Sequence, residues 1–143
     1  MLFLDTNVFL YAVGRPHPLR DPCRRLIARI GRGELSATTS SEVIQELLFV
    51  LDRRAERAAG IRLAGSVMEL LPTLMPVGAP ELKAALALLE DQEAITVRDA
   101  IHAGTALLHG IERIVTADRH FELFAGLRRI HPAEAADLPT EGS

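Results

Sequence analysis

The chain has 143 residues, 48% of them hydrophobic, and a formal charge of −3. This length and hydrophobic content favour one domain with a single core, and the acidic balance argues against a nucleic-acid binder with a generally basic face, although a local basic patch stays open. Cys23 is the only cysteine and no apolar run approaches the roughly 20 residues of a membrane span, so we expect a cytoplasmic protein without an intramolecular disulfide.

Short apolar strands alternate with helices along the chain. Strands or extended pieces are expected at residues 2–4, 35–38, 74–77, 113–116 and 127–130. Helices are expected at residues 8–13, 21–30, 40–54, 61–71, 80–90 and 97–109. The alternation predicts an α/β fold, a three-layer α/β/α sandwich with a mostly parallel central sheet. Residues 1–133 are expected to form the single domain, and residues 134–143 a polar, loose C-terminal tail.

Asp5 and Asp118 each follow an expected strand. In open parallel sheets, ligands bind beyond the carboxyl ends of the strands, and both residues occupy such ends. Either residue alone has an alternative role, because aspartate is a favoured cap at the start of a helix. Carboxylates that converge in one cleft repel by up to about 4 kcal/mol per pair at 4 Å in an effective dielectric of about 20. A cluster of them therefore calls for a bound cation.

Two further acids, Glu42 and Glu46, lie four residues apart on one face of an expected helix. Thr39 and Glu42 match a capping box, in which the glutamate reaches back to the threonine backbone, so Glu42 has a local structural role. Glu46 lies one turn deeper, where an unpaired carboxylate is costly unless it meets a cation or a hydrogen-bond donor. We prefer Glu46 as a metal ligand and keep Glu42 as a substitute or additional site acid.

Asp99 opens a helix whose residues are largely apolar. Thr96 and Asp99 also fit a capping box, and Arg98 offers Asp99 a surface salt bridge, so a structural role stays open. The apolar face nevertheless places the start of this helix against the core. His102, three residues later on the same face, is a candidate for a substrate or supporting contact. Gly104 inside the helix predicts close packing on a neighbour.

Several carboxylates in one place suit a hard cation such as Mg²⁺ or Mn²⁺, which prefers oxygen ligands. Such an ion lowers the pKa of bound water and stabilises the oxygens of a phosphodiester displacement, so no covalent residue is needed. The sequence has no Walker loop, nucleophile elbow, CxxC pair or HExxH motif. Arg15, Arg98 and Arg119 are candidates for phosphate contacts. The pattern predicts metal-assisted phosphodiester chemistry.

Four short motifs occur in a characteristic order. They are Leu-Asp-Thr-Asn at 4–7, Ser-Ser-Glu-Val-Ile-Gln-Glu-Leu at 40–47, Val-Arg-Asp-Ala-Ile-His-Ala at 97–103 and Ile-Val-Thr-Ala-Asp-Arg-His-Phe at 114–121. On these motifs the chain resembles the PIN-domain family, especially the VapC-type toxins of bacterial toxin–antitoxin pairs, over nearly its whole length. It departs from the usual pattern at Gly104, where an alanine-like residue is more usual, and at His120, which replaces an acid often found after Asp118.

The resemblance implies specific roles for the residues of the motifs. The acidic metal site would consist of Asp5, Glu46, Asp99 and Asp118, with Thr6, Asn7 and Thr116 as supporting hydrogen-bond donors. It also implies a Mg²⁺- or Mn²⁺-dependent endoribonuclease, the toxin of a type II pair, that hydrolyses RNA with a metal-activated water. The implied partners are the RNA substrate, a small cognate antitoxin that inserts into the active-site groove, and a second copy of the chain.

Three other functions are compatible with the same residues. One is a PIN-like RNA-processing nuclease that has no antitoxin. Another is aspartyl-phosphate chemistry, which needs an activating lysine, whereas Lys83, in the middle of an expected helix, is the only lysine. The third is a non-catalytic protein-interaction module whose acids only cap helices, and it predicts that Mg²⁺ leaves the stability of the chain unchanged.

Overall fold

The protein is described by a computed structural model that places residues 1–142. In chain order the elements are β1 (Leu2–Leu4), α1 (Thr6–Val13), α2 (Arg20–Gly31), β2 (Ala37–Thr38), α3 (Ser41–Arg53), α4 (Arg57–Leu70), α5 (Ala79–Asp91), α6 (Val97–Leu108), β3 (Arg113–Val115), the 3-10 helix η1 (Arg119–Leu123), β4 (Arg128–Ile130) and α7 (Pro132–Ala136). The strands form one parallel sheet in the order β2-β1-β3-β4, which confirms the expected α/β class.

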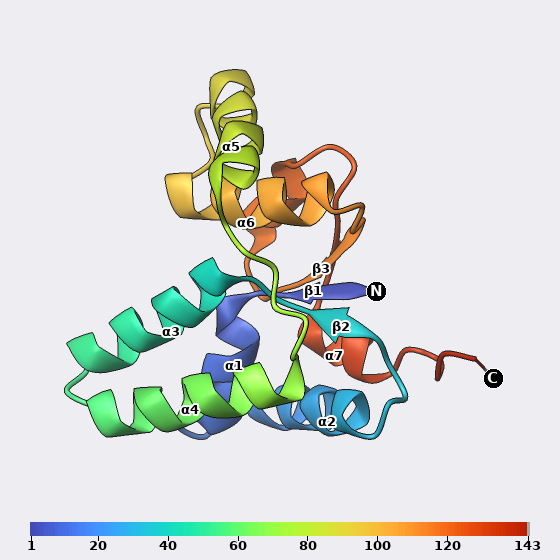
Figure 1. Ribbon diagram of the computed structural model, residues 1–143. Coiled ribbons are helices and arrows are strands. Elements are labelled where there is room, and N and C mark those ends of the chain that lie inside the picture. Colours follow the sequence, from blue (N-terminus) through green and yellow to red (C-terminus); the bar gives the residue numbers. More distant parts are fainter. Residues whose placement is uncertain (143) are drawn as a thin grey trace.

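Helices cover both faces of the sheet (Figure 1). Helices α5 and α6 pack together on one side, whereas α1, α2 and α7 form a layer on the other. Helices α3 and α4 pack against each other as a hairpin that projects to the side of the sheet. The three-layer arrangement is therefore confirmed. Over residues 1–142, no helix combines the length and the apolar character needed to cross a membrane.

The strand β1 lies at the centre of the core. Its residues Leu2, Phe3 and Leu4 are completely buried, as expected for a strand covered on both faces by helices. Phe3 pairs with Ile114 and Leu4 with Val115 of the neighbouring strand β3. Because the two strands are parallel and in this register, the residues that follow them emerge side by side at one edge of the sheet.

The α5–α6 pair shows why a glycine stands inside α6. A Cβ atom added at Gly104 would lie 2.9 Å from the backbone nitrogen of Ala85 and 3.2 Å from the carbonyl carbon of Ala84, so the two helices approach backbone to backbone. The close packing expected at this glycine is confirmed. It fixes the position of α6, whose first turn carries Asp99.

The start of α3 differs from the expectation. The hydroxyl oxygen of Ser40, not of Thr39, accepts the capping hydrogen bond, from the backbone N–H of Val43 at 3.3 Å. The capping box expected between Thr39 and Glu42 is therefore wrong. The physical reason is that the chain stays extended for one residue longer: Thr39 donates its hydroxyl hydrogen to the Leu4 carbonyl at 2.8 Å, and Ser40 forms a parallel bridge with Met75.

The C-terminal segment is also more ordered than expected. Helix α7 begins at Pro132, and its residues Ala135 and Ala136 are buried. The guanidinium of Arg29 donates hydrogen bonds to the carbonyl oxygens of Ala136 and Leu138, at 2.9 and 2.6 Å. The expectation of a loose tail thus differs from the structure, because small alanines and backbone carbonyls anchor a segment that reads as polar.

Candidate active site

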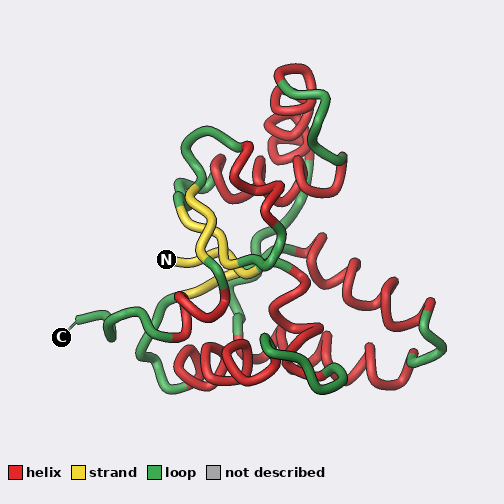
Figure 2. The backbone as a smooth tube through the Cα atoms, turned by 180° about the vertical axis from the view of Figure 1, so that it is seen from behind, coloured by secondary structure: helices red, strands yellow, loops and turns green. Residues whose placement is uncertain are grey.

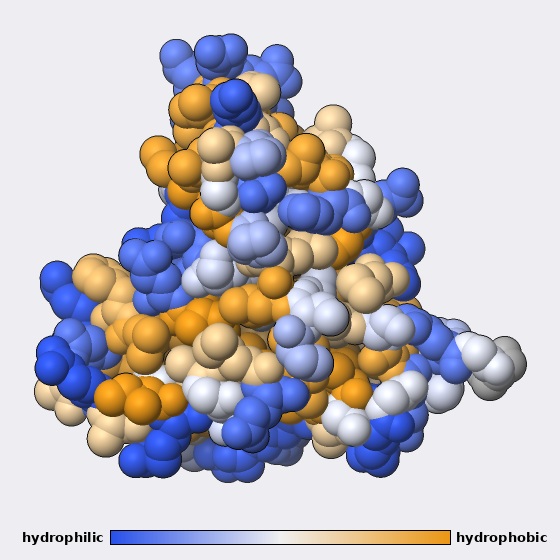
Figure 3. Space-filling model, in the orientation of Figure 1, coloured by the Kyte–Doolittle hydropathy of each residue, from blue (hydrophilic) through white to orange (hydrophobic). Residues whose placement is uncertain are grey.

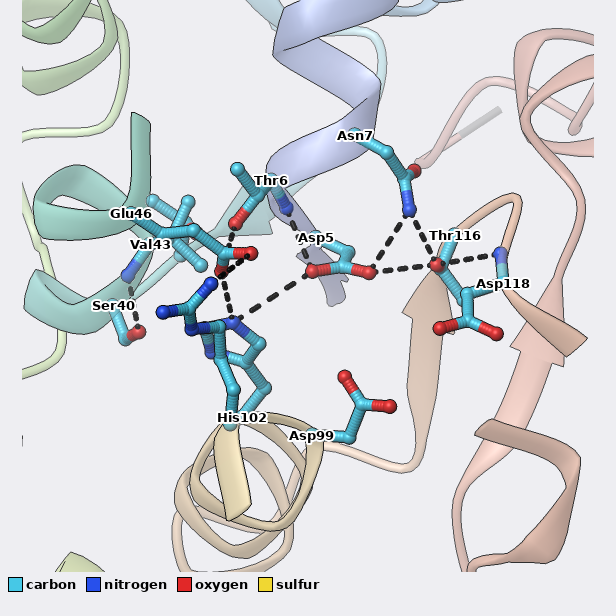
Figure 4. Close-up of polar contacts among 12 residues, drawn as sticks. Asp5, Thr6, Asn7, Ser40, Val43, Glu46, Asp99, His102, Thr116 and Asp118 are labelled. Atoms are coloured by element: carbon cyan, nitrogen blue, oxygen red, sulfur yellow. Dashed lines mark hydrogen bonds and ion pairs between the residues drawn. The ribbon is translucent and has the colours of Figure 1, made fainter. Parts of the chain in front are cut away.

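Asp5 occupies the first position after β1 and is only 6% exposed. Its Oδ1 accepts a hydrogen bond from the backbone N–H of Thr6 at 2.7 Å and so caps α1. Its Oδ2 accepts from the Thr116 hydroxyl at 2.7 Å and from the Asn7 amide at 3.1 Å (Figure 4). Burial raises the pKa of Asp5, although the charge of His102 and these hydrogen bonds work in the opposite direction. The carboxylate is therefore held rigidly in a place where its charge is costly without a cation.

Glu46 reaches the same place from α3. The Thr6 hydroxyl donates to its Oε2 at 2.7 Å, and Nε2 of His102 lies 2.8 Å from the same oxygen. A guanidinium nitrogen of Arg98 lies 3.5 Å from Oε1. Burial works to raise the pKa of Glu46, but the hydrogen bonds from His102 and Thr6 outweigh it and lower that pKa. Glu46 thus has the donors that its depth in the fold requires.

His102 projects from α6 into the carboxylates and is 1% exposed. Its Nε2 lies 2.8 Å from Glu46 and 3.9 Å from Oδ1 of Asp5. Burial works to lower the pKa of His102, but the Glu46 hydrogen bond and the negative charge of Asp5 outweigh it and raise that pKa. Its Nδ1 is buried without a hydrogen-bond partner in the described chain. The structure thus places this lower-ranked sequence candidate at the centre of the cluster.

Asp99 lies in the first turn of α6 and is half-buried. The Thr96 hydroxyl oxygen caps the helix by accepting from the Asp99 backbone N–H at 3.2 Å, as the sequence indicates. The Asp99 carboxyl group nevertheless points toward the space shared with Asp5 and Asp118 (Figure 4). Burial and, next, the charge of Asp118 raise the pKa of Asp99. Capping and membership of the carboxylate cluster are therefore compatible.

Asp118 follows β3 and caps η1. Its Oδ1 accepts from the backbone N–H of His120 at 2.9 Å and lies 2.7 Å from Nδ1 of the same histidine. This hydrogen bond raises the pKa of His120, whose side chain is 66% exposed. His120 therefore pairs with the Asp118 carboxylate at the solvent edge of the cluster.

Thr116 and Asn7 connect the two strand ends. The Thr116 oxygen donates to Asp5 and accepts from the Asn7 amide and the Asp118 backbone N–H, both at 3.0 Å. Asn7 also accepts a hydrogen bond from the backbone N–H of Ala117 at 3.1 Å. With the contacts of Thr6, each of the three expected supporting residues therefore has a hydrogen-bond partner in the cluster. The signal for them in the sequence was the resemblance of the motifs at 4–7 and 114–121 to the PIN-domain pattern.

The remaining candidates lie at the edge of the cluster or outside it. Arg98 pairs with Glu46 and not with Asp99, so the surface salt bridge considered for Asp99 does not occur. Within residues 1–142 the side chain of Glu42 has no hydrogen-bond or ion-pair partner. Arg119 is exposed in the first turn of η1, next to Asp118.

The donor set fits a hard divalent cation. Asp5, Glu46 and His102 offer atoms that all lie within 4.8 Å of one another, and Asp99 and Asp118 add carboxylate oxygens on the open side. Oxygen-rich sets of this kind suit Mg²⁺ and Mn²⁺ better than soft metals. A cation here would relieve the burial and repulsion that raise the pKa values of Asp5 and Asp99.

Comparison with known proteins identifies the architecture. A sequence profile of the PIN domain matches residues 2–127. The chain belongs to the PIN-domain family. It is 36% identical to Ribonuclease VapC7 of Mycobacterium tuberculosis over 139 residues, which cover 94% of each chain. It is 35% identical to Ribonuclease VapC23 of the same species over 118 residues, which cover 82% of this chain and 93% of the relative.

Solved PIN-type toxins share the fold. The M. tuberculosis VapC20 structure, described as a Sarcin-Ricin loop cleaving toxin, superposes with a TM-score of 0.75 at 20% identity and covers 91% of this chain and 98% of its own. VapBC2 from Rickettsia felis, bound to promoter DNA, gives 0.74 at 19% identity, with 92% and 98% coverage. PIN nucleases use divalent metal ions, and the acidic and histidine side chains described above form a possible site for one.

Proposed function

We propose that this chain is an endoribonuclease that hydrolyses RNA phosphodiester bonds with Mg²⁺ or Mn²⁺, as the toxin of a type II toxin–antitoxin pair. The observation that carries the proposal is the convergence of Asp5, Asp99 and Asp118 at the ends of β1 and β3 and the start of α6. The relatives at 35–36% identity, which are named ribonucleases, support the same reaction.

The proposed roles follow from the contacts of each side chain. Asp5, Asp99 and Asp118 would hold the ion, and Glu46 would join them directly or through water. When bound, a divalent cation supplies a water of lowered pKa and neutralises charge at the phosphate. Thr116 fixes the direction of the Asp5 carboxylate by a 2.7 Å hydrogen bond.

Two arginines flank the proposed reaction centre. The side chain of Arg98 is 47% exposed and lies at the open side of Glu46, and Arg119 is exposed beside Asp118. We propose that both contact phosphates of the RNA, since guanidinium groups bind phosphate oxygens in pairs. Their positions would place the backbone of the substrate over the carboxylates.

The test is cleavage of RNA by the purified chain in Mg²⁺, in Mn²⁺ and in EDTA. Asp118→Asn removes one proposed ligand while its amide oxygen still accepts the η1 capping bond. Asp21→Asn, at an exposed acid of α2, is the matched control. We expect activity only with a cation, loss of it in Asp118→Asn and retention in Asp21→Asn. Cleavage in EDTA, or by a folded Asp118→Asn variant, contradicts the proposal.

A small antitoxin is the proposed partner. Solved relatives of the same fold include the VapBC2 and FitAB complexes. On this chain, Leu48, Phe49 and Ile61 are 37, 52 and 60% exposed and line a groove on the α3–α4 hairpin. Apolar surface is visible over this hairpin at the lower left of Figure 3. Phe49→Asp should weaken co-purification with the product of a short reading frame upstream. If Phe49→Asp still co-purifies with that product and its RNA cleavage is still inhibited by it, the partner binds another surface.

A second copy of the chain is also a proposed partner. An apolar groove of about 410 Å³ runs between α1, α2 and α4 and is lined by Val13, Ile27 and Leu63, among others. Val13 is 54% exposed there. Sedimentation of the purified chain tests the proposal, and a monomer at all accessible concentrations contradicts it.

A further inference from the structure

A groove begins where the candidate active site ends. It has a volume of about 1030 Å³, which is large enough for a nucleotide-sized ligand. Asn7, which bonds to Asp5 and Thr116, forms one end of its wall, and Tyr11 continues the wall one turn further along α1. The loop between α1 and α2, on the near side of Figure 2, and the turn between α3 and α4 close the other end. Asn7 therefore links the wall of this groove to the carboxylate cluster.

The charge of this groove is locally positive although the chain is acidic. Arg15, in the loop after α1, and Arg54, at the end of α3, both line it and are exposed. Within residues 1–142 neither side chain has an acidic partner. Glu56 is the acid among the lining residues, and it has no ion pair either. Two unpaired guanidinium groups thus remain available for phosphate oxygens.

The same groove carries a fixed aromatic surface. The rings of Tyr11 and His17 lie with their centroids 4.5 Å apart and their planes at 31°. Nδ1 of His17 accepts a hydrogen bond from the Leu19 backbone N–H at 3.0 Å, and Pro16 and Pro18 restrict the backbone on either side. His17 is exposed, so its ring is accessible from solvent. A rigid aromatic ring beside free arginines is the combination that binds a phosphate and a base together.

We propose that this groove binds single-stranded RNA beside the cleaved bond, with Arg15 and Arg54 on the phosphates and a base stacked on His17. The proposal rests on the proposed ribonuclease function, because Asn7 joins this subsite to the reacting carboxylates. Single strands are favoured because their bases can leave the stack and lie against an aromatic ring, whereas a duplex keeps its bases paired. The subsite deepens the proposed function by naming where the strand runs.

The experiment measures binding separately from cleavage. The Kd of a fluorescein-labelled, mixed-sequence single-stranded RNA is measured for the wild-type chain in EDTA. The Kd of the same RNA is then measured for the Asp118→Asn variant in Mg²⁺. The Arg15→Gln/Arg54→Gln double variant should raise Kd about tenfold and reduce the salt dependence by about 1.4 in slope, from about 0.7 per lost phosphate contact. His17→Ala should raise Kd about fivefold without changing the slope, since stacking carries no counterion release.

The control is Arg25→Gln, which removes one exposed charge on α2 where the arginine pairs with Asp137. It should bind RNA like the wild type, and circular dichroism should show that every variant is folded. Wild-type affinity in both the double arginine variant and His17→Ala overturns the subsite, as does the absence of measurable RNA binding by the wild type. A chain that binds RNA through these residues but never cleaves it would contradict the proposed function and leave the subsite standing.

Discussion

The two sides of the carboxylate cluster differ in how completely the protein supports them. On the inner side, Asp5 and Glu46 receive hydrogen bonds from Thr6, Thr116 and His102, among others. On the outer side, Asp99 and Asp118 are only half-buried, and the hydrogen bonds to the Asp118 carboxylate come from the exposed His120. The fold itself thus supplies hydrogen-bond partners to the inner carboxylates, whereas the outer carboxylates rely largely on water or a bound cation.

Because the two sides differ in support, substitutions can separate effects on stability from effects on catalysis. Changes on the inner side should act on stability first, because they remove partners from buried charges. Changes on the outer side should act on catalysis first, because solvent already compensates part of the charge there. The site is therefore testable one side at a time.

Asp99→Asn, on the outer side, should have the largest effect on activity. We expect RNA cleavage to fall about a thousandfold, the size of effect seen when one preorganised group at a reacting centre is lost. Stability in EDTA should stay constant or rise, because the change removes a carboxyl group whose pKa is raised by burial and by Asp118. Single-turnover cleavage and thermal unfolding measure the two quantities. Activity within tenfold of the wild type would remove Asp99 from the reaction.

His102→Ala, on the inner side, should have the opposite profile. Removing the imidazole leaves Glu46 without its 2.8 Å partner and opens space beside Phe3, so we expect unfolding to become easier by about 3 kcal/mol. Urea denaturation measures this cost, and His102→Gln, which keeps a donor, serves as the milder comparison. A loss below about 1 kcal/mol would show that Thr6 and Arg98 suffice for Glu46.

The sequence predicts the acids at the strand ends of this site better than the contacts between its helices. Asp5 and Asp118 are predictable, because parallel strands bring acids at their ends to one edge of the sheet. The position of His102 is not predictable from the sequence. Helical spacing shows which face of α6 carries His102, but it does not show which face of α3 packs against it. Only packing shows that Glu46 lies opposite it, 56 residues earlier in the chain.

The errors at two chain segments have the same origin. The Thr39–Glu42 capping box follows from residue types, but the bridge of Ser40 to Met75 delays the start of α3. The tail after residue 133 reads as polar, but the carbonyl contacts of Arg29 anchor it from α2. In both cases a contact between segments that are distant in the sequence decides the outcome, and local sequence patterns do not encode such contacts.

Asn7→Ala should reveal how strongly the two sides are coupled. The Asn7 amide bonds to Asp5 and Thr116 and accepts from the Ala117 backbone, one residue before Asp118. Losing it should reduce cleavage about 10- to 100-fold, as for other groups that orient metal ligands. The stability cost should stay near about 1 kcal/mol, because Asp5 keeps its bonds from Thr6 and Thr116. If the loss of cleavage is no larger than the loss of folded protein, Asn7 acts on folding alone.

The effect of pH on stability should be the smallest, and it follows from the raised pKa values. His102 has an unfolded pKa near 6.5 and a higher one in the fold, so its ion pair with Glu46 stabilises fully below 6.5 and fades as the pH rises through the folded pKa. The raised pKa values of Asp5 and Asp99 act in the same direction, because the fold holds their protons more tightly than the unfolded chain does.

In EDTA, the free energy of unfolding should therefore be lower at about pH 8 than at about pH 6, because the His102 contribution is lost only above its unfolded pKa. Mg²⁺ takes the place of the lost protons among the carboxylates, so its stabilisation should be larger at the higher pH, approaching about 2.7 kcal/mol at one hundred times Kd. Thermal unfolding at both pH values, with Mg²⁺ and with EDTA, measures the difference. A Mg²⁺ effect that is equal at both, or absent, would show that protons and cation do not compete and that the inner side is complete without a metal.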